Sequence, residues 1–198
     1  MNHTNLFHFF KKGLPLFSLL SLALSYWSCH PISSKPSELI DWIPQNSSCV
    51  IQINDANTLT SELTNNEVLK EIKLLNKGLT ADISSLLSGT PDIESLLCVT
   101  KVGKNPGALT HIYKAPLDST LTNGPSIMYS KMQINIEKRA TKVLYSTNIS
   151  GYTLRSTSQL LIENCIRTSQ QNSTSNTTKL FKTIYATLDT DAPINILV

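Results

Sequence analysis

The chain has 198 residues, of which 16% are charged and 40% are hydrophobic, and its formal net charge is +3 at pH 7. Its lysines and arginines are scattered, and no nucleic-acid-binding motif accompanies them. A nucleic-acid-binding protein usually has a clustered basic surface, so this class is excluded. The length is enough for one domain with a buried core.

The first residues have the three zones of an export signal. A pair of lysines precedes an apolar run over 13–27, and the small residue Ser28 stands before Cys29. The run is shorter than the ~20 residues that a membrane-spanning helix needs. After Cys29 the chain is rich in Pro and Ser, and the apolar pattern does not continue. We predict a signal peptide over 1–28, a tether over 29–37 and a domain over 38–198.

A cysteine that closes such a signal resembles the lipobox of bacterial lipoproteins, whose thiol is acylated and becomes the first residue after cleavage. Ser28 matches the small residue of that pattern, whereas Tyr26 and Trp27 depart from its preference for Leu and a small residue. The resemblance implies lipidation of Cys29, with membrane lipid as the partner that retains the protein. Ordinary signal cleavage near Cys29 and an uncleaved anchor are the alternatives.

A strand and a helical region open the predicted domain. A β-branched run over 50–53 follows a Pro-Gln-Asn turn and predicts a strand. Asp55 or Asn57 can cap the helix after it. Apolar residues at mixed spacings of three and four continue the helical pattern, with breaks near Asn65 and Gly78.

The middle of the chain predicts an antiparallel arrangement. The segments 93–103 and 105–115 have strand-like patterns, and the Gly-Lys-Asn-Pro-Gly connection between them has strong turn residues, which together predict a hairpin. The segment 126–158 alternates apolar and polar residues and predicts a meander of three strands, with turns near 137–140 and 148–151.

The last part of the chain predicts two helices and a strand. The helices are expected over 159–168 and 179–188, on either side of a polar low-complexity loop, and an apolar strand ends at Val198. The element order predicts the α+β class: a mostly antiparallel sheet with helices packed on one face. The apolar end favours the front part of a longer protein.

The segment ELIDWIPQNSSCVIQINDANTLTSELTNNEVL, residues 38–69, and the signal ending in Cys29 resemble the opening of large uncharacterised envelope lipoproteins of flavobacteria and related Bacteroidetes. They are also similar to a periplasmic domain group of unknown function. The resemblance implies a cell-envelope location, facing the periplasm or the exterior. It supplies no catalytic residues.

Three cysteines follow Cys29 in the chain. Cys49, Cys98 and Cys165 lie in apolar patterns and are interpreted as free core thiols, with a Cys49–Cys98 disulfide as the alternative. The spacing of cysteines and histidines matches no metal site.

Candidate catalytic residues are few. His111 is expected on the polar face of a strand, and a nucleophile and base pair of Cys98 and His111 across the hairpin is the alternative. Asp189 and Asp191 are expected to form a turn, with calcium binding as the alternative. We therefore expect no catalytic residues and no cofactor.

The resulting expectation is an exported, lipid-anchored envelope protein with a non-catalytic binding or scaffolding role and an envelope protein as a further partner. The first alternative is an envelope hydrolase that uses the Cys/His pair. The second is a secreted, glycosylated interaction module, since glycosylation triplets occur at Asn46, Asn148, Asn172 and Asn176.

Overall fold

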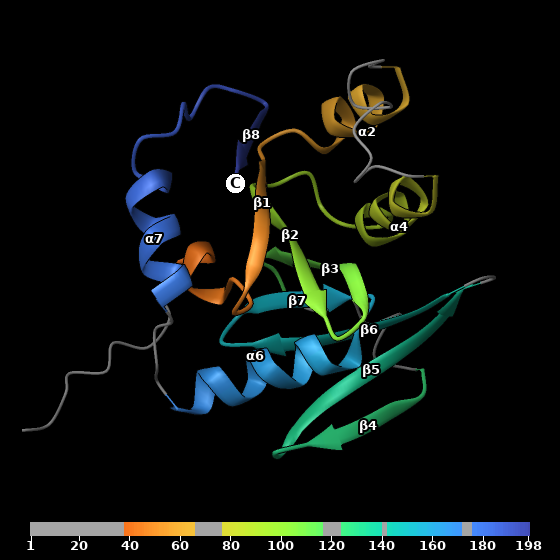
Figure 1. The fold of residues 1–198 in the computed structure, drawn as a ribbon. Coiled ribbons are helices and arrows are strands. Elements are labelled where there is room, and N and C mark those ends of the chain that lie inside the picture. The colour runs from red at the N-terminus through yellow and green to blue at the C-terminus, as the bar shows by residue number, and fades with distance from the viewer. Residues whose placement is uncertain (1–37, 66–76, 117–123, 140–141, 172–175) are drawn as a thin grey trace, which may run out of the picture. The chain divides into compact units, whose positions relative to one another are not determined.

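One antiparallel sheet of eight strands organises the part of the chain that the computed structural model describes, residues 38–65, 77–116, 124–139, 142–171 and 176–198. The strands lie in the order β4-β5-β6-β7-β3-β2-β1-β8, and each adjacent pair is antiparallel (Figure 1). Their bounds are β1 (Ser47–Ile53), β2 (Ser95–Val102), β3 (Asn105–Tyr113), β4 (Ser126–Tyr129), β5 (Met132–Arg139), β6 (Lys142–Ile149), β7 (Tyr152–Ser156) and β8 (Ile194–Leu197). The prediction of a mostly antiparallel sheet is confirmed, and the architecture is compatible with the α+β class.

Five helical elements accompany the sheet within the described residues. They are the 3-10 helix η1 (Leu39–Trp42) and the α-helices α2 (Ala56–Asn65), α4 (Lys77–Leu87), α6 (Gln159–Gln171) and α7 (Asn176–Tyr185). Asp55 caps α2, because its carboxylate accepts hydrogen bonds from the backbone N–H groups of Asn57 and Thr58 at 2.9 and 3.0 Å. These bonds satisfy two donors that a helix start otherwise leaves without partners.

The segment predicted to hold three strands holds four, because one turn was missed. Ser130 and Lys131 join β4 to β5, and both have positive φ, 50° and 66°. A two-residue turn of this kind matches the twist of antiparallel strands, but Asn and Gly are the residues that normally indicate it. Ser150 and Gly151, which join β6 to β7 with φ of 54° and 84°, carry the usual glycine and lie in a predicted turn.

Buried side chains alternate between the two faces of the sheet. In β2, Leu96 and Cys98 belong to one buried cluster, whereas Leu97 and Val99 belong to another. The first cluster includes side chains from η1, α6 and α7, and its side of the sheet is called the α6 face below. The second includes side chains from α2 and α4, and its side is called the α4 face. Since successive residues of a strand point to opposite sides, the two clusters lie on opposite faces.

These clusters do not match the expectation that helices pack on one face. The central strand β2 is buried continuously from Ser95 to Thr100, which is the pattern of a strand covered on both sides. The expectation relied on the alternating pattern of β5, which lies next to the edge strand β4 and is less covered. The central and outer parts of the sheet therefore have different surroundings.

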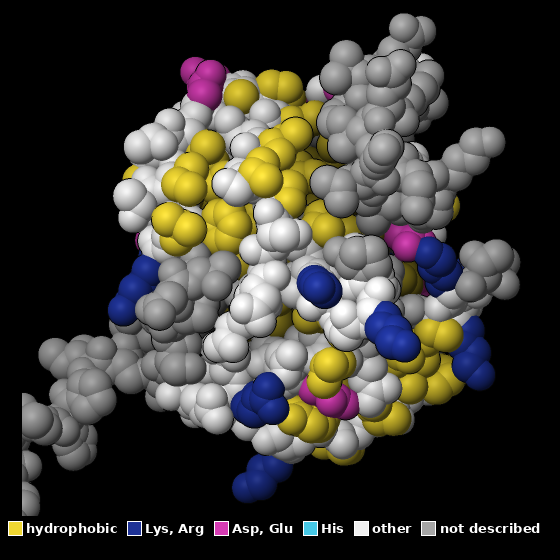
Figure 2. Space-filling view, in the orientation of Figure 1, with side chains coloured by type: hydrophobic (Ala, Val, Ile, Leu, Met, Phe, Trp, Pro, Cys, Tyr) yellow, Lys and Arg dark blue, Asp and Glu magenta, His cyan; other side chains and the backbone are white. Residues whose placement is uncertain are grey.

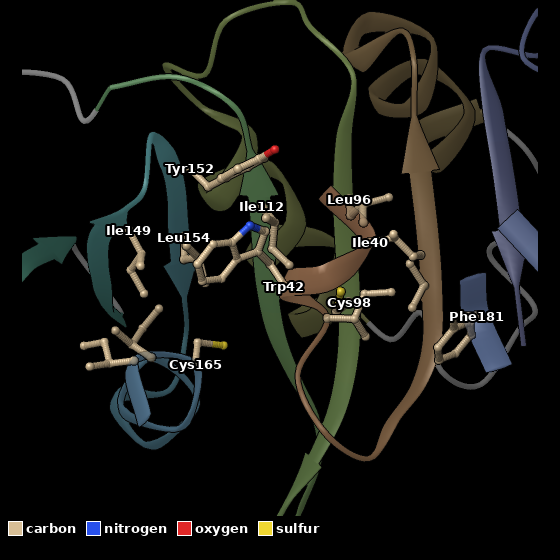
Figure 3. Packing of buried hydrophobic residues seen from close by; sticks show 14 of the residues in the cluster. Ile40, Trp42, Leu96, Cys98, Ile112, Ile149, Tyr152, Leu154, Cys165 and Phe181 are labelled. Atoms are coloured by element: carbon tan, nitrogen blue, oxygen red, sulfur yellow. The ribbon is translucent and has the colours of Figure 1, made fainter. Parts of the chain in front are cut away.

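Trp42 anchors the N-terminal end of the described chain to the α6 face. The side chain is 4% exposed, and its ring centroid lies 5.5 Å from that of Tyr152 in β7. Figure 3 shows the indole beside Leu154 and Ile112, with Ile40 of the same short helix nearby. Burial of large apolar side chains stabilises a fold by ~2 kcal/mol each. The short helix η1 is therefore part of the core.

Candidate functional site

The structure does not bring Cys98 and His111 together. Cys98 pairs with Thr110 across the β2–β3 ladder, whereas His111 pairs with Leu97, one position further along. Cys98 belongs to the cluster on the α6 face, and Leu97 belongs to the cluster on the α4 face. Because residues paired across a ladder share a face, Cys98 and His111 project to opposite sides of the sheet. A nucleophile and base pair of these two residues is therefore wrong.

The cysteines described by the structure are free thiols. Cys49 and Cys98 lie on adjacent strands, but Cys98 pairs with Val50 and Cys49 pairs with Val99, so the two thiols also face opposite sides. The Cys49–Cys98 disulfide is therefore wrong, and the interpretation of buried thiols is confirmed for Cys98 and Cys165, whereas Cys49 is half-buried.

Burial also decides the chemistry of these thiols. It raises the pKa of Cys165 to about 12, and it raises the pKa of Cys98 well above the usual range, with smaller contributions from the neighbouring thiols. The half-buried Cys49 has a raised pKa for the same reason. Because the thiolate is the nucleophile, these three thiols are poorly suited to attack a substrate at neutral pH.

A buried arginine that the sequence pattern did not single out lies on the α4 face. Arg155 of β7 is 1% exposed. Its Nη1 donates hydrogen bonds to the carbonyl oxygens of Leu86 and Ser88 at 2.8 and 3.1 Å, and its Nη2 donates to Oε2 of Glu137 at 3.2 Å. The last carbonyls of a helix have no partner within the helix, so this guanidinium caps α4 from the sheet. The sequence did contain an indication of this role. Arg155 lies within the short strand YTLRS, and a charged side chain that is buried in a sheet needs hydrogen-bond partners.

His111 lies beside Arg155 in the same row of the sheet. The two residues are paired across β3 and β7, and His111 is 1% exposed. Burial, and secondarily the charge of Arg155, lowers the pKa of His111 to about 3. Both of its ring nitrogens lack a hydrogen-bond partner among the described residues, and its ring lies 5.1 Å from that of Tyr113. His111 is therefore a neutral buried side chain on the α4 face, and the expectation of a polar strand face is wrong.

Two of the hollows on the described surface lie beside helices. The larger, of about 290 Å³, lies between α2 and the end of α4. Its polar lining consists of Asn57, Thr60, Ser84, Ser88, Thr90 and Asp92. The smaller, of about 20 Å³, lies between the turn after η1 and the C-terminal half of α6. The larger lining contains no histidine, cysteine or lysine, and the thiol in the smaller one is Cys165, whose raised pKa makes it a weak nucleophile at neutral pH.

The remaining predicted sites have simple surroundings. Asp189 accepts a hydrogen bond from the backbone N–H of Asp191 at 2.9 Å, which confirms the turn. Within the described ranges, no three His, Cys, Asp or Glu side chains are grouped so that they could hold a metal ion. Cys29, the predicted lipidation site, lies outside the described residues.

The glycosylation triplets differ in their surroundings. Asn46 is exposed in a turn with a φ of 64°. The amide nitrogen of Asn148 donates hydrogen bonds to the carbonyl oxygen of Ala115 and to Oγ1 of Thr153, at 3.1 and 3.2 Å, so it is already occupied. Asn172 lies outside the described residues, and Asn176 begins α7.

No helix among the described residues has the length and the apolar character needed to cross a membrane. Comparisons of the chain with protein-family models, with curated proteins and with solved structures find no match.

Proposed function

We propose that the chain is an exported cell-envelope protein, held at a membrane by lipid on Cys29, whose folded part has a non-catalytic binding or scaffolding role. The observation that carries the proposal is the N-terminal order of lysines, a short apolar run, Ser28 and Cys29. One acyl chain gives marginal membrane binding, and two or more give stable anchoring.

The predicted tether is short. It joins Cys29 to Glu38, the first residue of the predicted domain, nine positions later (38 − 29 = 9). A fully extended chain spans at most 3.3–3.6 Å per residue, so nine residues reach ~30 Å. A lipid on Cys29 would therefore keep the sheet and its helices close to the membrane surface. An envelope protein partner bound by this part would be held at the same surface.

The non-catalytic role is supported by what the buried reactive side chains do. Cys98 and Cys165 pack in the α6 face, and Arg155 caps α4 while His111 lies neutral beside it. These residue types are the ones from which catalytic sites are usually built, and here each has a place in packing or in capping. This arrangement favours binding over an envelope hydrolase.

Replacement of Cys29 tests the anchor. Cys29→Ser is expected to move the full chain from the membrane fraction to the soluble fraction, or to block its processing, because serine lacks the thiol that receives the lipid. Cys49→Ser is the matched control, since it removes a half-buried thiol of the folded part and is expected to leave the membrane fraction unchanged. The measurement is the intact mass of the protein from each fraction. Normal cleavage and unchanged membrane partitioning of Cys29→Ser would show that the anchor is not a lipid on this residue.

The secreted, glycosylated module is the second candidate, and the exposed turn at Asn46 favours it. If this candidate is right, the intact mass of the secreted chain includes a glycan, and the Asn46→Gln variant lacks that added mass. Protein from its natural source that carries no glycan at Asn46 would contradict this candidate's support from the exposed turn.

A further inference from the structure

His111 is enclosed on the α4 face without an acceptor for an added proton. Its side chain is 1% exposed, and both ring nitrogens lack a hydrogen-bond partner among the described residues. Figure 2 colours histidine cyan and shows none among the described side chains of the face that it presents. A buried charge is stable only where hydrogen bonds or an opposite charge offset the loss of water. The closed fold offers an imidazolium at this position no hydrogen bond from a described residue.

The charge directly beside His111 is positive. Arg155 lies opposite His111 across β3 and β7, a position at which Cβ atoms are ~4.5–5.5 Å apart. On the other side β2 contributes the uncharged Leu97, and the ring next to the imidazole along β3 is that of Tyr113. Like charges directly opposite each other destabilise a strand pair. A protonated His111 would therefore repel the guanidinium of Arg155.

The carboxylates on this side of the sheet are engaged elsewhere. The described charged or titratable side chains that β1, β5, β6, α2 and α4 contribute on the α4 face are those of Cys49, Glu137, Arg139, Lys142, Glu62 and Asp82. Glu137 and Asp82 are in ion pairs with basic side chains, and Glu62 is exposed. Burial comes first and the charge of Arg155 second among the causes that lower the pKa of His111.

Arg155 also connects this position to the larger of the two hollows. Its Nη1 donates hydrogen bonds to the carbonyl oxygens of Leu86 and Ser88, at 2.8 and 3.1 Å. Ser88 and the neighbouring Leu87 line the hollow of about 290 Å³, and residues of α2 line its other side. Figure 1 shows α2 and α4 next to each other. One guanidinium therefore lies between His111 and a wall of this hollow.

We propose that protonation of His111 in acid releases the end of α4 from Arg155 and so opens the hollow between α2 and α4. When the end of α4 moves away from the sheet, water reaches both cations, and the proton is no longer disfavoured. The proton therefore binds the open form and shifts the population toward it. The cluster of the α6 face lies on the other side of the sheet, so α4 can open while that cluster persists. The proposal does not depend on the lipid anchor.

Hydrogen exchange of the α4 amides in the full chain tests the opening. The measured quantity is the protection factor, which compares the observed rate with that of an unstructured chain at the same pH. With pKa values of about 3 in the closed form and ~6.5 in the open form, the ratio of open to closed form rises ~25-fold from pH 7 to pH 5. The protection of the α4 amides is expected to fall by this factor. In His111→Leu and in His111→Gln, neither of which titrates at this position, it is expected to stay the same.

Low concentrations of urea separate this opening from unfolding of the whole chain, because the effect of urea scales with the surface that is exposed. At pH 5 the α4 amides are expected to be less protected than those of the central strand β2, and to respond little to urea. The amides of β2, which is buried from Ser95 to Thr100, are the internal control. Their protection is expected to fall steeply with urea, since they exchange when the whole fold opens.

Each outcome decides the proposal. A fall in α4 protection that responds little to urea and is absent from the two His111 variants supports it. Unchanged protection of α4 between pH 7 and pH 5 overturns it, and so does an equal fall in wild type and in the variants, since another group then titrates. Equal protection and equal urea dependence of α4 and β2 at pH 5 also overturn it, because His111 then takes up its proton only when the whole fold opens.

Discussion

Arg155 shows at the scale of a single residue how a buried charge is tolerated. Its Nη1 and Nη2 donate hydrogen bonds to two carbonyl oxygens at the end of α4 and to Glu137, and these bonds offset the cost of removing the guanidinium from water. Its Nε has no hydrogen-bond partner among the described residues. The contact joins a strand and a helix that are far apart in the sequence. Arg155 therefore fixes the end of α4 over the sheet.

We expect Arg155→Met to lower the free energy of unfolding by about 2–4 kcal/mol, because the carbonyl oxygen of Leu86 loses its charged donor in a buried place. Arg139→Met is the matched control: Arg139 also pairs with Glu137, but its side chain is 30% exposed. The control is expected to change stability by less than about 1 kcal/mol. Urea unfolding of both variants checks this. Equal losses would mean that the ion pairs, and not the helix cap, carry the effect.

His111 gives stability a dependence on pH. Its pKa is about 3 in the folded protein and ~6.5 in an unfolded chain, so below pH 6.5 the unfolded state binds a proton that the folded state does not. Stability is therefore lost as the pH falls from 6.5 toward 3, and the loss attributable to His111 is about 2 kcal/mol at pH 5. His111→Leu is expected to remove this part of the difference between unfolding measured at pH 7 and at pH 5. The same difference in wild type and variant would contradict a neutral buried imidazole.

At the scale of the element, α7 is held to the sheet by three different contacts. Phe181 is buried in the cluster of the α6 face, and Lys182 forms an ion pair with Asp41 of η1 at 2.5 Å. The hydroxyl of Tyr185 donates a hydrogen bond to Glu94, and the amide of Gln52 donates to the same carboxylate at 2.9 Å. The helix thus connects η1, β1 and the residue before β2.

Removal of one hydroxyl tests the polar part of this attachment. Tyr185→Phe is expected to destabilise the fold by about 1 kcal/mol, because the hydrogen bond to Glu94 is lost while the ring stays. Tyr145→Phe is the control, since its hydroxyl has no hydrogen bond within the described part of the chain and it is half-buried in the same cluster. The control is expected to stay within ±0.5 kcal/mol of wild type in thermal or urea unfolding. A larger loss in the control would remove the hydrogen bond as the explanation.

At the scale of the whole molecule, the buried thiols report on global opening. In a Cys29→Ser background, a thiol reagent at pH 8 is expected to modify Cys49 first, since it is half-buried, and to reach Cys98 and Cys165 only when the fold opens. Mass spectrometry of partly labelled protein gives the order of labelling, and denatured protein gives the complete reaction. Fast labelling of Cys98 in the native state would contradict the packing of the α6 face.

Much of the local structure could be predicted from the sequence. The hairpin of β2 and β3, the cap at Asp55 and the turn at Ser150 depend on residues that are neighbours in the chain. The turn at Ser130 and Lys131 could not be predicted, because neither residue is one that commonly adopts positive φ. The candidate site was predicted least well, since the row of His111 and Arg155 depends on the pairing of β3 with β7.

The sequence by itself determined most of the local elements and the antiparallel character of the sheet, and its N-terminal pattern is the basis for proposing a lipid on Cys29. Only the tertiary structure decided that β8 pairs with β1, that Cys98 and His111 lie on opposite faces, and that Arg155 caps α4. The physical reason is the distance along the chain between the groups that interact. Turns, caps and periodicity are set by groups a few residues apart, whereas strand order and two-sided burial depend on which distant segments exclude water together.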